Sequence, residues 1–334
     1  MKKISLYILL LATFAFFSSC NDEWEDELYQ KMVSFRAPLD SDGVCNIYLR
    51  YNADGVVSYN LPVIVSGSKT NDQNIYVKIA TDNDTLGILN IEKFQFRTDL
   101  FFKQLPDSYY KLPASVWQIP AGNDVVTYPI EFKLNDLDLV DKWVLPLTIE
   151  DDPSYITNKR KGLRKALLKI NLYNDYSGTY SATATNIYFD GETTNPAVVD
   201  SRRMSVVDEQ SIFFYAGSIW EEGEDRGKYK IIARFGEGIK NADGSINGSL
   251  TLFAPNSSEI EFQQIGEATY TVIEGMDPTL PYIKHRYVTL KMEYKYTDIT
   301  SAPGNPIRYR VSGTMTMGRD INTLISDESQ AINW

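Results

Sequence analysis

The sequence predicts an all-β protein built from two domains. Short runs rich in β-branched and aromatic residues recur along most of the chain, and turn-forming clusters separate them, which is typical of strands. Several runs alternate apolar and polar residues, as expected of strands with one buried face. The polar, turn-rich segment at 174–178 interrupts the series, so it divides the strands into two sets.

The first set of strands falls within residues 31–173. Its runs lie at 32–35, 44–51, 56–65, 74–80, 125–134, 143–150 and 166–173. Seven short strands in about 140 residues predict an immunoglobulin-like β-sandwich. The Asn-Ala-Asp-Gly sequence at 52–55 predicts a hairpin turn between the second and third runs. The less regular stretch at 94–112 is expected to hold a short helix or a long crossing loop.

The second set of strands falls within residues 174–334. Its runs lie at 179–189, 204–216, 228–235, 249–254, 260–265, 269–273, 283–296 and 307–317. In the last two, apolar and polar residues alternate over 288–296 and 309–317, so one face is buried and the other is wet. Turns such as 241–244 join neighbouring runs. Eight meandering strands predict a small closed β-barrel, because closure removes the unpaired edges of a long sheet.

The first 19 residues have the layout of a signal peptide. Two lysines precede an apolar run at 4–17 that is too short to span a bilayer. Two small residues then precede Cys20, as lipoprotein signal peptidase requires for cleavage and lipid transfer to the thiol. We therefore expect 1–19 to be removed and Cys20 to be the lipidated N-terminus. Phe17 replaces the usual Leu of this motif, so ordinary secretion with cleavage nearby is the alternative.

Residues 20–30 form an acidic segment that is too charged and too short to fold alone. It is expected to act as a solvated tether. The carboxylates that follow Cys20 resemble the acidic signal of surface-exposed lipoproteins of Bacteroidetes. This resemblance implies an outer-membrane protein that is held by its lipid anchor and faces the extracellular medium. A spacer with no sorting role is the alternative.

The charge and cysteine content limit the partners and the chemistry. The formal net charge is −11, so nucleic acid and anionic lipid surfaces are poor partners. Only Cys20 and Cys45 are present, and lipid occupies the first, so no intramolecular disulfide is expected. Cys45 lies in a strand-like run, where an inert core residue is the expected role.

No catalytic set can be assembled from the sequence. His285 is the one histidine and has charged neighbours, so a surface role is expected, and metal ligation by His and Cys is excluded by count. The Asp-Ser-Asp-Gly sequence at 40–43 lacks the further ligands of a calcium loop and predicts a turn. Acidic pairs such as 151–152 are expected in any acidic protein. We therefore expect a protein that is not an enzyme and has no cofactor or metal.

Three motifs in order carry a family resemblance: Leu-Pro-Ala at 112–114, Ile-Pro-Ala-Gly at 119–122, and Trp-Val-Leu-Pro-Leu-Thr-Ile at 143–149. They resemble the N-terminal β-sandwich domain of Bacteroidetes lipoproteins encoded in polysaccharide-utilisation loci, a family catalogued largely as a domain of unknown function. Tyr-Ser-Gly-Thr-Tyr at 176–180 and Val-Ser-Gly-Thr at 311–314 resemble the lipocalin-like (calycin-like) C-terminal β-barrel that accompanies it.

The resemblance implies non-catalytic capture of a poly- or oligosaccharide beside an outer-membrane glycan importer. Some relatives carry a glycosidase module in place of the second domain, but no length is left for one here. One alternative is a structural or assembly subunit of a surface complex that does not bind sugar. Another is a barrel that carries a small apolar ligand.

The candidate sugar-binding residues lie in and beside the loop at 217–227. Sugars present flat apolar faces edged by hydroxyls, so their sites combine an exposed ring with polar side chains. Trp117 and Trp143 are expected in the core, whereas Trp24 and Trp334 lack rigid support. If the second domain binds sugar, Trp220 is the expected stacking platform; a lid that packs the barrel end is the other interpretation, which the sequence leaves open. Its expected companions are Glu221, Glu222, Asp225 and Arg226 for the hydroxyls, and Tyr215 and Tyr229 to extend the platform.

Overall fold

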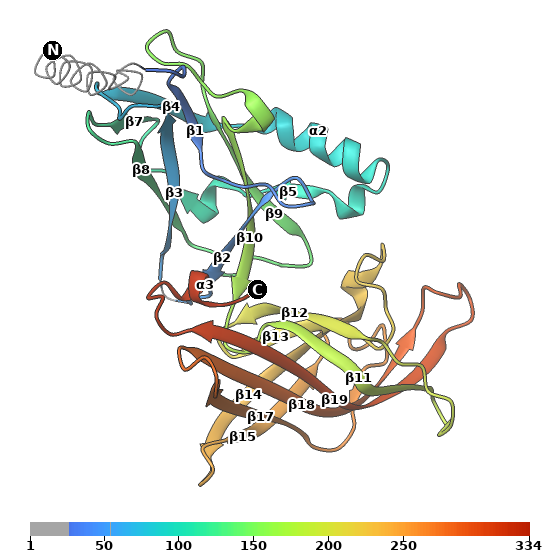
Figure 1. Ribbon diagram of the computed structural model, residues 1–334. Helices are drawn as coiled ribbons and strands as arrows, with labels where there is room; N and C mark the ends of the chain where they lie inside the picture. The colour runs from blue at the N-terminus through green and yellow to red at the C-terminus, as the bar shows by residue number, and fades with distance from the viewer. Residues whose placement is uncertain (1–26, 54) are drawn as a thin grey trace, which may run out of the picture.

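The computed structural model describes residues 27–53 and 55–334 and confirms an all-β fold, with an upper and a lower domain in Figure 1. The predicted signal peptide, the predicted lipidation site at Cys20 and Trp24 lie outside the described residues. Within the described part, no helix is long and apolar enough to cross a membrane.

The N-terminal domain is a sandwich of two sheets. The first sheet has the order β1 (Met32–Phe35), β3 (Val57–Ser66), β8 (Val125–Phe132) and β6 (Tyr110–Lys111). The second has the order β2 (Cys45–Arg50), β10 (Lys165–Tyr173), β9 (Lys142–Ile149), β4 (Ile75–Thr81) and β7 (Val116–Ile119), with β5 (Phe102–Gln104) also paired to β9. Apolar side chains from both sheets form one core.

Two local expectations for this domain are corrected. The turn at 52–55 does not close a hairpin, because β2 pairs in parallel with β10 while β3 pairs with β1 and β8 in the other sheet. Helix α2 (Asn83–Phe94) was not predicted; it precedes the stretch at 94–112, for which a short helix or a long crossing loop was expected. Asp82 caps α2 by accepting a hydrogen bond from the Thr85 backbone N–H. The 94–112 stretch holds β5, β6, η2 (Thr98–Leu100) and η3 (Asp107–Tyr109).

The C-terminal domain is a closed eight-stranded antiparallel barrel, as the strand pattern predicts. Its strands are β11 (Gly178–Phe189), β12 (Ser201–Asp208), β13 (Ser211–Tyr215), β14 (Lys230–Lys240), β15 (Ile246–Phe253), β17 (Ala268–Met276), β18 (Ile283–Asp298) and β19 (Ile307–Asn322). Pairing of β18 and of β11 with β19 closes the barrel. The short β16 (Gln263–Gln264) pairs with β18.

Two predicted barrel strands differ from those observed. The run at 204–216 is a hairpin of β12 and β13, since polar residues at 208–210 interrupt it. The run at 260–265 contributes only β16. Large aromatic side chains such as Tyr180, Phe214 and Tyr294 are fully buried and fill the barrel interior, so the structure gives no support to a small apolar ligand there.

Two short elements complete the fold: η4 (Arg160–Gly162) in the sandwich, and α3 (Glu328–Ala331) at the end of the chain. Helix α3 follows the barrel but returns to the N-terminal domain, where it lies close to β2 (Figure 1). The polar segment at 174–178 joins β10 to β11. Each domain has its own core cluster, and Val206 of β12 packs with the sandwich cluster.

Candidate ligand-binding cleft

A cleft of about 550 Å³ lies between the two domains. Its upper wall is the outer face of β2 and β10. These strands are in parallel register, which pairs Asn46 with Lys169 and Tyr48 with Asn171. The residues that alternate with these along each strand, such as Ile47, point into the sandwich core. The strand alternation therefore presents a polar and aromatic face to the cleft.

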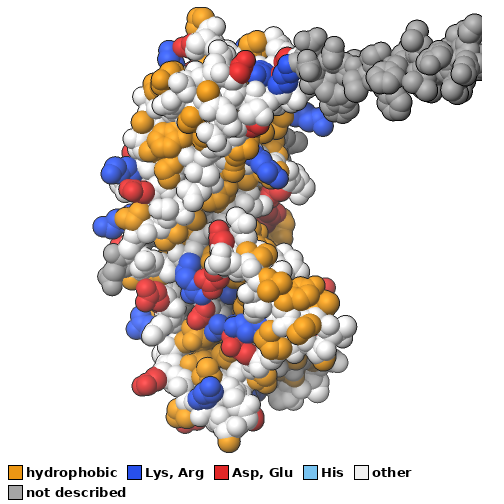
Figure 2. All heavy atoms as spheres, turned by 60° about the vertical axis from the view of Figure 1, so that its left-hand side comes forward, with side chains coloured by type: hydrophobic (Ala, Val, Ile, Leu, Met, Phe, Trp, Pro, Cys, Tyr) orange, Lys and Arg blue, Asp and Glu red, His pale blue; other side chains and the backbone are white. Residues whose placement is uncertain are grey.

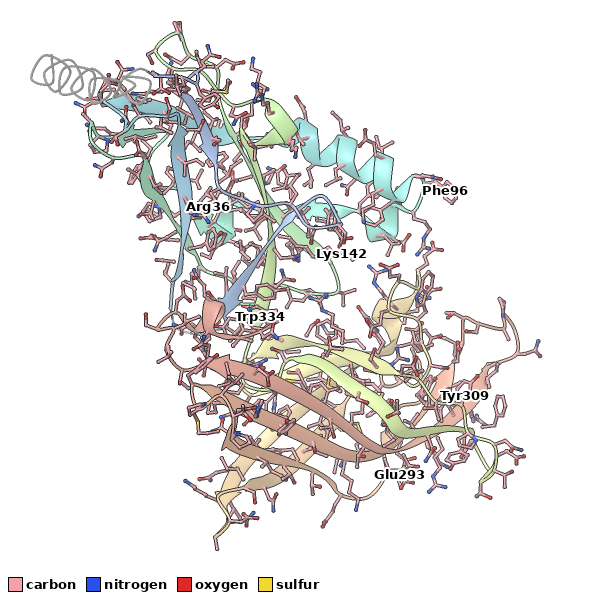
Figure 3. All side chains as sticks on the ribbon, viewed as in Figure 1. Arg36, Phe96, Lys142, Glu293, Tyr309 and Trp334 are labelled. Atoms are coloured by element: carbon pink, nitrogen blue, oxygen red, sulfur yellow. The ribbon has the colours of Figure 1, made fainter. Side chains whose placement is uncertain are left out.

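The lower wall is the outer surface of the barrel, contributed mainly by β12, β13 and β19. Arg203, Tyr215 and Arg319 line it. Lys142 of β9 and Trp334 at the chain end also line the cleft, and Figure 3 shows both between the domains. The volume falls within the range of about 300–1,000 Å³ typical of ligand pockets, and interfaces between domains are common places for them.

An aromatic pair stands in this cleft. Trp334 stacks on Tyr48 with ring centroids 4.1 Å apart and planes 5° apart, and Tyr173 meets the indole edge-on at 4.8 Å. The Trp334 Nε1–H donates to the Ser329 carbonyl oxygen at 2.8 Å. The expectation that Trp334 lacks rigid support is therefore wrong. Trp334 as a whole residue remains 45% exposed, and the Arg319 guanidinium lies 5.5 Å from the indole centroid, so part of the residue is available to a ligand.

A chain of polar contacts crosses from one wall to the other. The Asn46 amide donates to the Asp40 carboxylate, and the Asn171 amide donates to Asn46 Oδ1 at 3.0 Å. Arg203 then reaches across from β12, and its Nη2 donates to Asn171 Oδ1 at 3.2 Å. Lys169 lies in the same row, and its burial, together with the nearby Arg203 charge, lowers its pKa.

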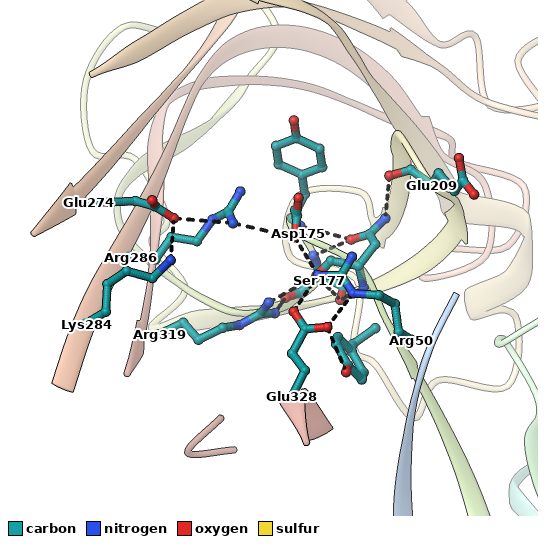
Figure 4. A network of polar contacts seen from close by, with 12 residues as sticks. Arg50, Asp175, Ser177, Glu209, Glu274, Lys284, Arg286, Arg319 and Glu328 are labelled. Atoms are coloured by element: carbon teal, nitrogen blue, oxygen red, sulfur yellow. Dashed lines mark hydrogen bonds and ion pairs between the residues drawn. The ribbon is translucent and has the colours of Figure 1, made fainter. Parts of the chain in front are cut away.

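Ion pairs hold one side of the cleft (Figure 4). Arg50 of β2 forms two hydrogen bonds of 2.6 Å to the Glu328 carboxylate of α3 and one of 2.8 Å to Asp175. The bond from Arg50 lowers the Glu328 pKa and raises that of Arg50. Arg286 and Glu274 of the barrel extend the network. Charged side chains also gather near the middle of the molecule in Figure 2, where the left side of Figure 1 is turned forward.

The loop at 217–227 holds the other side of the cleft. Arg226, with its side chain 6% exposed, donates to the Asp99 carbonyl oxygen at 2.9 Å and to the Val140 carbonyl oxygen at 3.4 Å. Lys142 pairs with Glu222 at 3.2 Å. An apolar cluster of Phe213, Tyr215 and Ile232 packs against Leu139 and Val140 of the N-terminal domain. This loop is therefore docked on the sandwich.

The predicted binding residues are only partly brought together. Those that line the cleft are Tyr215, Glu221, Glu222 and Arg226. Tyr229 is buried in the barrel, where its hydroxyl donates to Asp298 Oδ1 at 2.9 Å, and Asp225 pairs with Lys228. Trp220 is 61% exposed with the Arg97 guanidinium 5.9 Å from its ring, so it does not pack the barrel end as a lid. It is not among the residues that line the cleft.

Four residues of the cleft were not predicted from the sequence: Tyr48, Asn171, Arg203 and Trp334. A usable signal was present for the first two, because the runs at 44–51 and 166–173 alternate apolar residues with polar or aromatic ones. In a sandwich, such a pattern shows which residues face outward. It does not show that a second domain covers that face.

The remaining predicted positions have structural roles. Cys45 is buried in the sandwich core, where burial raises its pKa to about 11, and Trp117 and Trp143 pack partly buried against that core. The 40–43 segment is a turn closed by the Gly43 N–H donating to the Asp40 carbonyl oxygen. His285 lies between Asp277 at 2.9 Å and Asp320 at 2.6 Å, and these two contacts raise its pKa.

Comparison with known proteins identifies relatives of the whole chain. The model of a domain of unknown function, DUF4973, matches residues 24–153, and a second model, described as a "-like, C-terminal" domain, matches residues 164–316. No match was found among the curated proteins.

Several solved structures are similar over nearly the full length. A multidomain Bacteroides ovatus protein including DUF1735 is 43% identical, with a TM-score of 0.78 and coverage of 90% of this chain and 99% of that one. A Bacteroides thetaiotaomicron structure called an auxiliary nutrient binding protein is 38% identical, with a TM-score of 0.78 and coverage of 92% and 100%. The chain therefore belongs to the family of Bacteroides proteins that these structures represent.

Proposed function

We propose that this protein is a non-catalytic binding protein that captures a poly- or oligosaccharide in the cleft between its domains. The observation that carries the proposal is the partly exposed Tyr48–Trp334 pair in a ligand-sized cleft beside Asn171 and Arg203. The aromatic pair offers apolar surface to a sugar ring, and the amide and guanidinium groups match its hydroxyls. The relative called an auxiliary nutrient binding protein supports a role in nutrient capture.

The proposed setting is the outer surface of the outer membrane, where the protein would pass its ligand to a neighbouring importer. The motif around Cys20 and the acidic residues after it support this setting. One diacylglyceryl-modified cysteine, with or without a further acyl chain, would hold the protein without a spanning segment.

Replacing Cys20 by alanine is expected to release the protein from the membrane, because the lipid is attached to that thiol. Fractionation of cells followed by a salt wash measures this, with the wild-type protein as the control. Retention of Cys20→Ala in the outer-membrane pellet after the wash would disprove the proposed anchor.

The binding proposal is tested by affinity electrophoresis against a panel of polysaccharides. Tyr48→Ala is expected to weaken binding about tenfold or more, since it removes one ring and the support of Trp334, and tenfold corresponds to about 1.4 kcal/mol. Trp220→Ala is the matched control, because it removes an exposed ring outside the cleft.

Thermal unfolding of both variants verifies that each is folded. Loss of binding in Trp220→Ala with full binding in Tyr48→Ala would move the site to the 217–227 loop. Failure of the wild-type protein to bind any polysaccharide would refute the proposed function and favour an assembly role.

A further inference from the structure

We infer that the cleft selects glycans that carry an anionic substituent, a carboxylate or a sulfate ester, which binds between Lys169 and Arg203. This inference rests on the proposed function and names the class of its ligand. It depends on three features of the cleft: an arginine without a carboxylate partner, a largely buried lysine, and nearby acidic groups that already have partners.

Arg203 is the first feature. The guanidinium has five N–H donors, and the structure shows one hydrogen bond from it, to the neutral amide oxygen of Asn171 at 3.2 Å. Among the described residues, no Asp or Glu oxygen lies within 4.0 Å of the guanidinium nitrogens. The neighbouring Arg202 is different, because it is buried and lies 4.0 Å from Glu221. Arg203 thus keeps a planar set of donors that matches a carboxylate or sulfate.

Lys169 is the second feature. Its side chain is 12% exposed, and its nearest carboxylate oxygen, Asp42 Oδ2, is 3.7 Å away. The other oxygen of Asp42 already holds Lys93 at 2.8 Å. Lys169 and Arg203 both line the cleft, and burial followed by the Arg203 charge lowers the pKa of Lys169, although Asp42 and Asp40 act in the opposite direction. Keeping Lys169 charged there therefore has a cost in free energy. An anion between Lys169 and Arg203 would remove that cost.

The acidic residues around the pair are the third feature. Asp40 accepts hydrogen bonds from Asn46 and from the turn amides of Asp42 and Val44. Glu221 accepts a hydrogen bond of 2.8 Å from the Arg203 backbone N–H. These contacts leave the Arg203 side chain facing the cleft without a carboxylate partner.

The overall negative charge does not oppose such a ligand. The net charge of −11 is spread over the whole chain, and at physiological ionic strength charges more than about 8 Å apart are largely screened. The charges that line the cleft therefore decide the sign of the interaction, and there Asp141 already pairs with Lys103 and Glu222 with Lys142. Tyr48 and Asn171 are register partners, so a sugar ring on the aromatic pair would lie next to the proposed anion site.

The test is affinity electrophoresis and titration calorimetry with three probes: polygalacturonate, dextran sulfate and neutral dextran. The wild-type protein is expected to bind one or both anionic polymers and to bind neutral dextran at least tenfold more weakly. Binding of polygalacturonate alone identifies a carboxylate ligand, and binding of dextran sulfate alone identifies a sulfate ligand. Affinity is expected to fall as the salt concentration rises.

Three variants and one control test whether Lys169 and Arg203 cause the preference for anionic polymers. Arg203→Gln and Lys169→Gln are each expected to lose tenfold or more in affinity for the anionic polymer. The control Lys240→Gln removes an exposed barrel lysine and is expected to change nothing. Arg203→Lys keeps the charge and is expected to bind more tightly than Arg203→Gln, which separates a charge effect from a folding defect.

The outcomes distinguish the inference from the proposed function. Neutral dextran bound as tightly as the anionic polymers would overturn the inference and leave the proposed function standing. Equal losses in Lys240→Gln and Arg203→Gln would also overturn it, because they would show nonspecific charge attraction. If the wild-type protein binds no polysaccharide of the wider panel, both the inference and the proposed function are refuted.

Discussion

Replacing Gly313 by valine is expected to destabilise the barrel by about 3 kcal/mol or more. Gly313 has a φ of +144°, a backbone conformation that residues with a side chain rarely adopt. A Cβ built there would meet the carbonyl oxygen of Ala184 and lie 2.8 Å from the Cα of Thr185. Both neighbours are backbone of β11, so neither can rotate away.

The position of Gly313 explains why the effect is large. It lies in β19 between β11 and β18, where the barrel closes, and the β11–β19 register shifts between Ser181 and Ala184. Such an irregularity bends a strand, and glycine permits the close approach of the two backbones. The barrel therefore requires the glycine of the Val-Ser-Gly-Thr motif at 311–314 for close packing of β19 on β11.

Calorimetric unfolding measures the effect, with Gly275→Ala as the matched control. Gly275 lies in β17 of the same barrel, and a Cβ there meets nothing within 4 Å. Its replacement is expected to leave stability unchanged or to raise it slightly, since alanine has less freedom in the unfolded chain. A Gly313→Val protein that unfolds at the wild-type temperature would contradict the close-approach argument.

The architecture was predictable because it follows from alternation. In the middle of strands β18 and β19, buried positions alternate with partly or fully exposed ones, and this pattern is visible in the sequence. The β2–β3 hairpin failed because a turn sequence determines local geometry but not which sheet each strand joins. Helix α2 was missed although Asp82 offered a capping signal, since its outward face carries exposed Ile88 and Ile91 and blurs the apolar pattern.

The candidate site was less predictable, because it exists only after the domains dock. Tyr48 lies early in the sandwich, Arg203 in the barrel, and Trp334 at the chain end. Trp220 was proposed from the sequence of its own loop alone, because the polar residues and glycines around it suggested an accessible ring. Trp220 is exposed and is not the lid that the sequence also allowed, but the loop serves mainly to dock the domains through Arg226.

Replacing Arg226 by alanine is expected to loosen that docking and to cost about 2 kcal/mol of stability. The substitution removes hydrogen bonds to the carbonyl oxygens of Asp99, Val140 and Gly223, and an ion pair of 3.4 Å to the Asp99 carboxylate. The cost stays below that of a fully buried pair, because Asp99 is 21% exposed and keeps Arg97 as a second partner. Loosened walls would also weaken ligand binding in the cleft.

Small-angle scattering and limited proteolysis around 174–178 measure the docking, and calorimetry measures the stability. Lys228→Ala is the control, because Lys228 lies in the same short helix, η5 (Arg226–Tyr229), but its ion pair with Asp225 is exposed at the surface. Exposed pairs contribute about 0–1 kcal/mol, so that variant is expected to behave like the wild-type protein. An Arg226→Ala protein with unchanged scattering and unchanged proteolysis would show that the Arg50–Glu328 contacts and the apolar cluster are sufficient to hold the domains together.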